Sequence, residues 1–252
     1  FIYAAALEKG IMPNTLINDA PLSISGLETG GQMWEPKNYD GKFEGYMRMR
    51  TALAKSKNLV SVRVIRKIGA RYAQDYIQRF GFEAEKHPPY LTMALGAGSV
   101  TPLQLATGYG VFANGGYRVD PYLISKVIDA KGNVLFEATP TVAGDSNLKV
   151  LDSRTAFVMD SLLQEVTKTG TAASARVALA RSDIAGKTGT TNENSDGWFM
   201  GYTPQLMGGA WVGADDRFIH FNKESANGQG GRAAMPIWAY FFAKAEIGRA
   251  HV

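Results

Sequence analysis

The chain has 252 residues, 45% of them hydrophobic, with a formal net charge of +4 and no cysteine. The lack of cysteine excludes a disulfide scaffold, a thiolate zinc site and a cysteine nucleophile. No apolar stretch approaches the roughly 20 residues that cross a bilayer, and the charge is too small and too dispersed to indicate a nucleic-acid partner.

The first part of the chain is predicted to form helices around one long loop. A helix-like run begins at Phe1, and residues 21–45, rich in Gly, Pro and Asn, are predicted to be a surface loop. Apolar residues from Tyr46 to Leu53 mark a short helix. From residue 59 to residue 80, apolar residues recur at three- and four-residue spacing, which predicts a longer helical region.

Capping signals delimit two further helices. Thr101-Pro-Leu-Gln104 is a capping box with proline at the first helical position, and its helix is expected to end at Asn114-Gly-Gly116. Asp152 or Ser153 caps another helix, which is closed by Gly170.

Strand signals gather in the second half of the chain. Residues 122–128 and 133–137 flank a polar turn and are predicted to form a hairpin. Three strand-like runs, expected to be antiparallel neighbours, cover residues 184–191, 197–202 and 206–214. A last helix is predicted from Ala233 to about Ala245. Because the strands follow a group of helices and do not alternate with them, we expect an α+β fold in one domain.

The strongest chemical signal is Gly186-Lys-Thr-Gly-Thr-Thr191 on the first of these three strands. Gly189 would let a substrate backbone approach and pair with a strand edge. Lys187 supplies a positive charge, and the threonines can donate hydrogen bonds to a carboxylate. A solvent-facing lysine on an ordinary strand is the simpler alternative. A Walker A loop is excluded, because Arg181 stands where its first glycine would be and a strand follows.

A second and weaker signal is Ser56-Lys-Asn58, at the junction of two predicted helices. A hydroxyl and an amide at this junction can point into one cleft, where they would relay a proton and hold a substrate amide. Random placement gives about 0.6 such matches in a chain of this composition. A second match, Ser225-Ala-Asn227, does occur and is predicted to be a loop. A helix cap or a surface serine is the alternative for Ser56.

In the order Ser-x-Asn and then Lys-Thr-Gly, these motifs resemble the transpeptidase domain of penicillin-binding proteins. The segments that resemble its class A, bifunctional branch are Arg50–Val62, Ser99–Ala106, Phe112–Gly116, Asp183–Thr191 and Gly197–Tyr202. The resemblance covers nearly all of residues 1–245. It implies a penicillin-binding transpeptidase or serine β-lactamase-like fold, in which an antiparallel sheet packs with a helical subdomain.

One motif of the family is missing. The Ser-x-x-Lys that holds the nucleophilic serine and its lysine partner should precede Ser-x-Asn, but Ser146-Asn-Leu-Lys149, the only match, follows it and is predicted to be a linker. The segment from Phe1 to Leu7 resembles the helix that directly follows the nucleophile in the family. We therefore expect the nucleophilic serine and its lysine to lie just before Phe1, and residues 1–252 to be inactive alone.

The last seven residues, Glu246-Ile-Gly-Arg-Ala-His-Val252, are expected to be foreign to the protein. They follow the predicted last helix abruptly, and they back-translate to a DNA sequence that resembles a common sequencing-adapter oligonucleotide. We accordingly predict one incomplete transpeptidase domain over residues 1–245 and a non-native tail over 246–252.

The resemblance implies peptidoglycan cross-linking as the reaction of the intact protein. In the family, a serine attacks the carbonyl of a terminal D-Ala-D-Ala peptide, D-Ala leaves, and an amine of a second stem peptide resolves the acyl-enzyme. Ser56 would relay protons in these steps. Asn58 would hold the donor amide and position the catalytic lysine, while Lys187 would raise the positive potential of the cleft.

The resemblance also assigns the substrate-binding strand. Thr188 and Thr190 would bind the donor carboxylate, and the backbone N–H of Thr190 would supply half of the oxyanion hole. Gly189 and Thr191 complete this strand. β-Lactams are implied as inhibitors that mimic the D-Ala-D-Ala terminus. No metal or organic cofactor is implied, and the three histidines share no metal-ligand spacing.

Other functions would use the same motifs. A D,D-carboxypeptidase or a β-lactamase-like hydrolase would replace the acceptor amine with water, and a noncatalytic penicillin-sensing module would keep the cleft without turnover. The implied location is the periplasmic face of the bacterial inner membrane, with membrane contact only through an anchor outside these residues.

Three further segments carry weaker expectations. Trp198 and Trp211 are expected in the core, because large aromatic side chains on strands are mostly buried. Gly228-Gln-Gly-Gly231 is predicted to be a flexible turn. Trp34-Glu-Pro-Lys-Asn-Tyr39 is predicted either to line the cleft or to be a surface loop.

Overall fold

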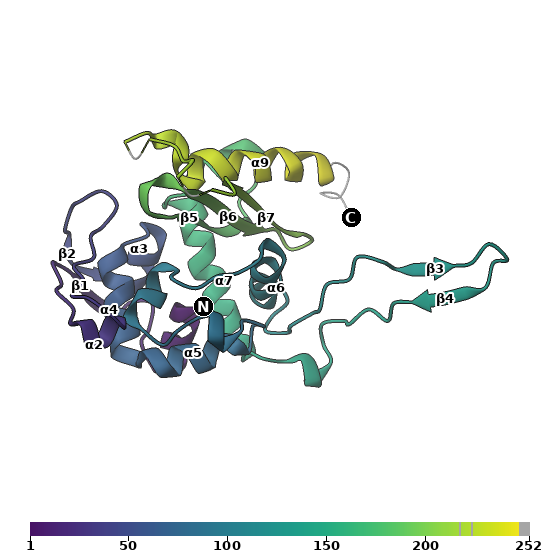
Figure 1. Ribbon diagram of the computed structural model, residues 1–252, viewed down its shortest axis with the longest axis horizontal. Coiled ribbons are helices and arrows are strands. Elements are labelled where there is room, and N and C mark those ends of the chain that lie inside the picture. The colour runs from purple at the N-terminus through teal and green to yellow at the C-terminus, as the bar shows by residue number, and fades with distance from the viewer. Residues whose placement is uncertain (217, 223, 247–252) are drawn as a thin grey trace.

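The computed structural model describes residues 1–216, 218–222 and 224–246. A three-stranded antiparallel sheet lies between helix α9 (Gly230–Ala245) and a larger group of helices, as Figure 1 shows. One hairpin projects far from this body. The strands and helices coexist as separate groups, so the predicted α+β class is confirmed.

The larger group of helices forms around α1 (Ile2–Glu8), in which every side chain from Tyr3 to Leu7 is buried. Helix α1 packs against α4, α5 and α7. The other helices of this part are α2 (Gly26–Thr29), α3 (Met49–Ala54), α4 (Asn58–Ile68), α5 (Ala70–Gln78), α6 (Pro102–Ala113) and α7 (Ser153–Lys168). Helix α8 (Ala173–Leu179) instead packs against α7 and α9.

The predicted caps are confirmed in detail. The Thr101 hydroxyl accepts from the N–H of Gln104, whose side chain accepts in turn from the N–H of Thr101, so both halves of the capping box are formed at the start of α6. Helix α6 ends at Ala113 with Asn114 as its C-terminal cap, as expected. Asp152 rather than Ser153 caps α7, and its carboxylate accepts from the N–H of Arg154.

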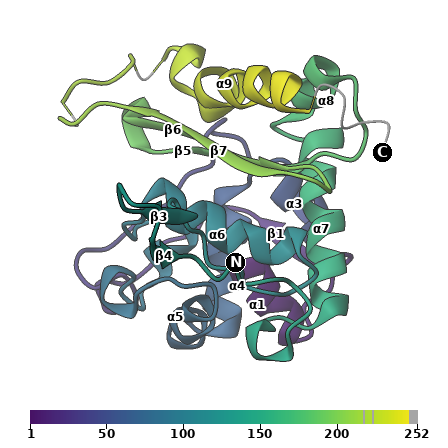
Figure 2. The same ribbon diagram turned by 90° about the vertical axis from the view of Figure 1, so that its right-hand side faces the viewer.

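The sheet consists of β5 (Ala185–Thr190), β6 (Asp196–Tyr202) and β7 (Met207–Gly213), in the order β5-β6-β7. Helix α9 covers one face, where Phe199 and Trp238 meet edge to face with ring centroids 5.0 Å apart. Helix α7 packs against β5, and α6 against β7, on the opposite side (Figure 2). The predicted antiparallel arrangement is confirmed, and β5 is an edge strand of this sheet.

The short helix expected from Tyr46 to Leu53 begins only at Met49, whereas the region expected to be helical over residues 59–80 is helical. Tyr46 belongs not to a helix but to β2 (Gly45–Arg48), which pairs with β1 (Leu16–Asp19) and so closes the long loop at its base. The helical region over residues 59–80 is two helices, because Gly69 breaks it with a φ of 91°. That φ lies in the region that favours glycine.

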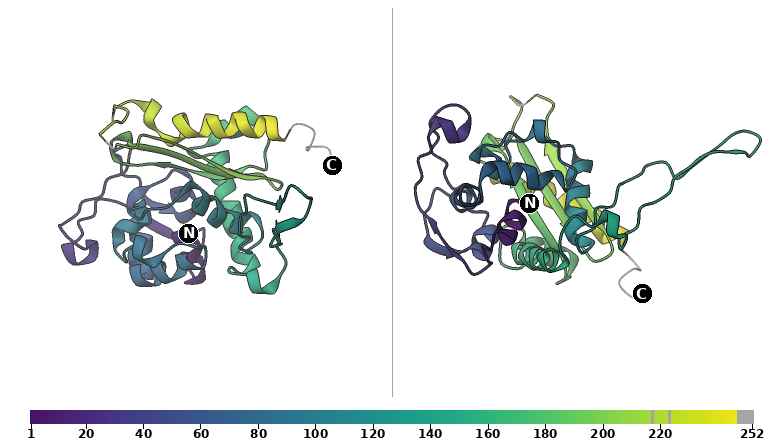
Figure 3. Two further views of the ribbon diagram at one scale, coloured as in Figure 1. Left: turned by 45° about the vertical axis from the view of Figure 1, so that its right-hand side comes forward. Right: turned by 90° about the horizontal axis from the view of Figure 1, so that it is seen from below.

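The projecting hairpin consists of β3 (Lys126–Ile128) and β4 (Val134–Glu137). All side chains of both strands are exposed. The views of Figure 3 show it reaching away from the helices and the sheet alike. The hairpin itself was predicted correctly, although its strands are shorter than the sequence indicated.

The predicted foreign tail lies mostly outside the described residues, because they end at residue 246. Glu246 is described and is buried at the end of α9. Its carboxylate lies 2.6 Å from the guanidinium of Arg181 and accepts a hydrogen bond from the hydroxyl of Thr203.

Candidate active site

The free edge of β5 is the centre of the candidate site. Thr191, just after β5, donates its N–H to the carbonyl of Asp196. Hydrogen-bonded pairs alternate along an antiparallel ladder, so Gly189 and Lys187 also point their backbone groups toward β6. Thr188 and Thr190 therefore present their N–H and C=O groups to the open edge. This edge can accept an extended peptide as an additional strand.

Lys187 joins this strand to the helical part of the molecule. It lies opposite Met200 in the ladder, on the face turned away from α9. Its Nζ donates to Ser56 Oγ at 2.8 Å and to the carbonyl oxygen of Thr188 at 2.9 Å. Desolvation by burial lowers the pKa of Lys187 to about 8, although the residue keeps some solvent exposure. The two motifs found in the sequence, 131 residues apart, thus meet in space.

Ser56 lies in the sharp turn between α3 and α4. Its φ of 56° is in the left-handed region, which is uncommon for a residue with a side chain. Such conformations cluster at functional sites. Asn58 is the first residue of α4, and its Nδ2 donates to the carbonyl oxygen of Lys37 at 2.9 Å. The Trp34–Tyr39 segment therefore reaches the Ser-x-Asn turn.

Thr171 belongs to the same site but carried no recognisable sequence signal. Its hydroxyl lies 2.7 Å from that of Thr188, and its N–H donates to the carbonyl of Ala54, at the end of α3. The turn between α7 and α8 thus joins the Lys-Thr-Gly strand to the Ser-x-Asn turn. Only the folded structure reveals this contact, because Thr171 stands 17 residues from Thr188.

The Gly228–Gly231 segment is packed against β5, and the expectation of a flexible turn was wrong. The N–H of Gly230 donates to the hydroxyl of Thr190 at 3.0 Å. A Cβ on Gly230 would lie 2.2 Å from the carbonyl oxygen of Gly189, so no other residue fits without a shift. Gln229 donates to the hydroxyl of Tyr39 at 3.1 Å, which brings the Trp34–Tyr39 segment to the start of α9 as well.

Thr191 closes the turn between β5 and β6. Its hydroxyl donates to Asp196 Oδ2 at 2.8 Å and accepts from the N–H of the same residue. Trp198 and Trp211 stand beside this turn with ring centroids 6.0 Å apart. Trp211 is 40% exposed and Trp198 is half-buried, so neither is a core residue and the expectation was wrong. Trp238, on α9, is instead buried against the sheet.

The other sequence matches lie apart from this cluster. Ser146 begins an exposed 3-10 turn next to the projecting hairpin, and Lys149 is exposed after it. Ser225 caps a short turn by accepting from the N–H of Asn227. In the described part of the chain, no group of three or more acidic or histidine side chains could hold a metal ion.

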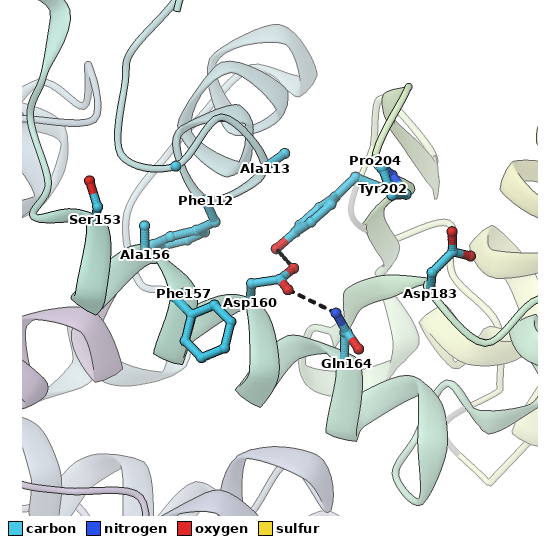
Figure 4. Close-up of a pocket in the computed structure, with 11 residues that line it drawn as sticks. Phe112, Ala113, Ser153, Ala156, Phe157, Asp160, Gln164, Asp183, Tyr202 and Pro204 are labelled. Atoms are coloured by element: carbon cyan, nitrogen blue, oxygen red, sulfur yellow. Dashed lines mark hydrogen bonds between the residues drawn. The ribbon is translucent and has the colours of Figure 1, made fainter. Parts of the chain in front are cut away.

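A cavity of about 310 Å³ lies at the opposite end of the sheet from Thr190 (Figure 4). The hydroxyl of Tyr202 donates to Asp160 Oδ1 at 2.9 Å, and the side-chain amide of Gln164 donates to Oδ2 at 2.8 Å. One carboxylate oxygen of Asp160 thus joins α7 to β6, and the other binds Gln164 one turn later in α7. This arrangement is a structural contact between helix and sheet.

Comparisons with known proteins agree with these observations. The family model described as the penicillin-binding protein transpeptidase domain matches residues 1–237. Penicillin-binding protein 1A of Neisseria flavescens is 47% identical over 241 residues, which are 96% of this chain but 30% of that protein. The chain thus spans less than a third of the length of this curated relative.

Solved structures show the same likeness. Penicillin-binding protein 1A from Haemophilus influenzae superposes with a TM-score of 0.86 at 34% identity, over 97% of this chain and 41% of that one. Penicillin-binding protein A from Mycobacterium tuberculosis, as a penicillin G acyl-enzyme complex, gives a TM-score of 0.72 at 22% identity, over 97% of this chain and 59% of that one. The second likeness concerns the fold alone.

Proposed function

The chain belongs to the penicillin-binding protein transpeptidase domain family, and from this premise we propose that it is the acyl-transfer domain of a class A penicillin-binding protein. The substrates would be peptidoglycan stem peptides: a donor ending in D-Ala-D-Ala and an acceptor carrying an amine. The observation that carries the proposal is the 2.8 Å contact of Lys187 with Ser56, beside a strand edge open to a peptide.

The reaction would proceed in two acyl-transfer steps. A serine hydroxyl loses its proton as its oxygen bonds to the donor carbonyl, and the bond to the terminal D-Ala nitrogen breaks as that nitrogen gains a proton. The acceptor amine then attacks the ester, loses a proton, and releases the serine. We propose that this serine and its lysine partner lie outside residues 1–252, because neither Ser56 nor Ser146 stands in a Ser-x-x-Lys sequence at the start of a buried helix.

Ser56 suits a proton relay in these steps. Its oxygen accepts from Lys187, so its own proton can be donated to the leaving nitrogen. Lys187 would keep the cleft positive and replace that proton. Asn58 starts α4 beside this pair, where its side-chain amide would hold the donor peptide.

The free edge of β5 would bind the end of the donor. The Thr190 hydroxyl already accepts from the N–H of Gly230, so its proton is available for the donor carboxylate, with Thr188 beside it. The N–H of Thr190 faces the open edge and would form half of the oxyanion hole. Gly189 has no side chain, so the donor backbone could approach the strand closely. Thr191 would hold the end of this strand through its hydrogen bond to Asp196.

The inhibitors and the location follow from the same proposal. β-Lactams would acylate the serine as mimics of D-Ala-D-Ala, which the acyl-enzyme form of the M. tuberculosis neighbour supports. Peptidoglycan substrates would place the domain in the cell envelope, on the periplasmic side of the inner membrane. Across the described residues, none of the helices combines the length and the apolar character that a membrane crossing requires.

Labelling with fluorescent penicillin tests the proposal. The full-length protein is expected to take a covalent label, and Lys187→Ala should slow acylation by about 100- to 1,000-fold, the range found when a charge-stabilising group is lost. Lys131→Ala, at the tip of the projecting hairpin, is the matched control and should acylate at the normal rate. Residues 1–252 alone should take no label. A stable label on Ser56 or Ser146 of this chain would overturn the assignment of the nucleophile.

A second measurement separates transpeptidation from hydrolysis. The release of D-Ala from a donor peptide would be followed with and without an amine acceptor. Cross-linked product in the presence of the amine is expected. Release of D-Ala to water alone, with no product that contains the acceptor, would instead assign a D,D-carboxypeptidase.

A further inference from the structure

We propose that Lys57, the middle residue of the Ser56–Asn58 turn, is a positioning residue of this site. Its buried ammonium group ties the turn to residues 37–44 and thereby fixes Ser56 and Asn58 for acyl transfer. The inference rests on the proposed function, since it concerns the same site.

The surroundings of Lys57 are unusual for a lysine. The residue is only 2% exposed. Its Nζ lies 2.9 Å from Asp40 Oδ2, 3.0 Å from Glu44 Oε1 and 3.6 Å from Asp19 Oδ2. A buried ammonium group is costly unless it is paired and hydrogen-bonded. Three carboxylates around one ammonium group meet that condition.

These carboxylates connect the turn to the long loop before it. Asp19, at the end of β1, accepts from the Asn38 side chain at 2.7 Å and from the N–H of Glu44 at 3.0 Å. Asn38 in turn accepts from the N–H of Leu59, in the first turn of α4, at 3.2 Å. This network therefore joins the end of β1 and the long loop to the start of α4, and Lys57 lies at its centre.

The same loop borders the candidate site. Its Lys37 carbonyl accepts from Asn58, and its Tyr39 hydroxyl accepts from Gln229 at the start of α9. Because Asp40 directly follows Tyr39, the contact of Lys57 with Asp40 holds this part of the loop in place. A shift of Lys57 and its three carboxylates would therefore move residues 37–44 and the Ser-x-Asn turn together.

Ser56 makes this anchoring necessary. A left-handed conformation is unfavourable for a residue with a side chain, so the turn needs contacts that hold it. Lys187 holds the Ser56 hydroxyl on one side, and the charge cluster holds Lys57 on the other. Without the cluster, the turn can relax and the Ser56 hydroxyl moves away from Lys187.

Lys55 provides a matched control two residues earlier. Its Nζ lies 2.6 Å from Glu44, but its side chain is 47% exposed and pairs with no other carboxylate among the described residues. Hydrogen bonds from Lys55 and from Lys57 both lower the pKa of Glu44. An exposed ion pair contributes little to stability. The two lysines therefore share a partner and differ in burial.

The test measures acylation of the full-length protein by fluorescent penicillin over a range of concentrations, which separates the apparent dissociation constant from the limiting rate. Lys57→Met should lower the limiting rate by about 10- to 100-fold, as misplacement of catalytic groups does, with little change in the dissociation constant. Lys57→Arg should restore part of the rate, and Lys55→Met should stay within about two-fold of the unsubstituted protein.

Asp40→Asn is a second variant, which keeps the test decisive if Lys57→Met fails to fold. Asp40 is 49% exposed, so the substitution should leave the thermal unfolding temperature nearly unchanged while still lowering the limiting rate. If Lys57→Met folds, a normal limiting rate in that variant would overturn the inference. If Lys57→Met does not fold, normal limiting rates in both Asp40→Asn and Lys57→Arg would overturn it. Absence of label on the unsubstituted protein would contradict the proposed function instead.

Discussion

The β5–β6–β7 sheet and the β3–β4 hairpin are both antiparallel, yet their environments are opposite. Helices cover the sheet on both sides, and Phe199 at its centre is fully buried. In the hairpin, Phe136 is 50% exposed and Leu135 is 66% exposed. An isolated two-stranded hairpin is at best marginally stable in water. The comparison shows that strand pairing alone does not build a site.

Packing changes the chemistry of the side chains on the sheet. Burial lowers the pKa of Lys187 to about 8, and the fold places its ammonium group 2.8 Å from Ser56 Oγ. On the hairpin, Lys126 lies 3.5 Å from Glu137, with both side chains largely in water. Such a surface pair has a small energetic effect. Of these two lysines, Lys187 is therefore the one that the fold removes from water.

The largest expected difference between the two regions is in stability. Phe199→Ala should lower the free energy of unfolding by about 3–5 kcal/mol, because it leaves a cavity beside Trp238. Phe136→Ala should change it by less than about 0.5 kcal/mol. Urea unfolding followed by tryptophan fluorescence measures both. Equal losses in the two variants would show that the hairpin is packed in solution.

The pH dependence of acylation sharpens the comparison further. A lysine is charged below its pKa, so Lys187 with a pKa of about 8 loses its charge as the pH rises through this value. The limiting acylation rate should then fall about ten-fold per pH unit above 8. Lys187→Arg keeps the charge and should flatten the profile. A rate that instead rises through pH 8 would make Lys187 a base and Ser56 the nucleophile it activates.

The sequence predicts the elements of both regions, because their signals are local. The Thr101–Gln104 capping box and the three strands of the sheet were found from neighbouring residues alone. The β1–β2 pair was missed because its register joins Leu16 to Arg48 across the long loop. Short polar strands give weak local signals, and their pairing depends on the rest of the fold.

The residues of the candidate site also divide into those that local sequence predicts and those that it misses. Lys187 on an edge strand was predicted from the glycine and lysine of one hexapeptide, and the structure brings it to Ser56. The burial of Lys57 was missed, since its partners Asp19 and Asp40 stand 38 and 17 residues away in the chain. Thr171 was missed for a similar reason. Residues that position a site act through tertiary contacts, and local patterns do not contain these.

The smallest expected effect tests the Ser-x-x-Lys match beside the hairpin. Ser146 and Lys149 are exposed, and the Lys149 ammonium group lies 5.6 Å from the centre of the Tyr117 ring. They stand in and just after an exposed 3-10 turn, not at the start of a buried helix. Ser146→Ala and Lys149→Ala should therefore acylate at the rate of the unsubstituted protein, within about two-fold. Ser56→Ala is the positive control and should be slowed strongly, because it removes the hydroxyl that Lys187 contacts. If Ser146→Ala lost the covalent penicillin label while Ser56→Ala kept it, the chemistry would belong to the exposed segment, and the contrast between the packed and the projecting region would fail.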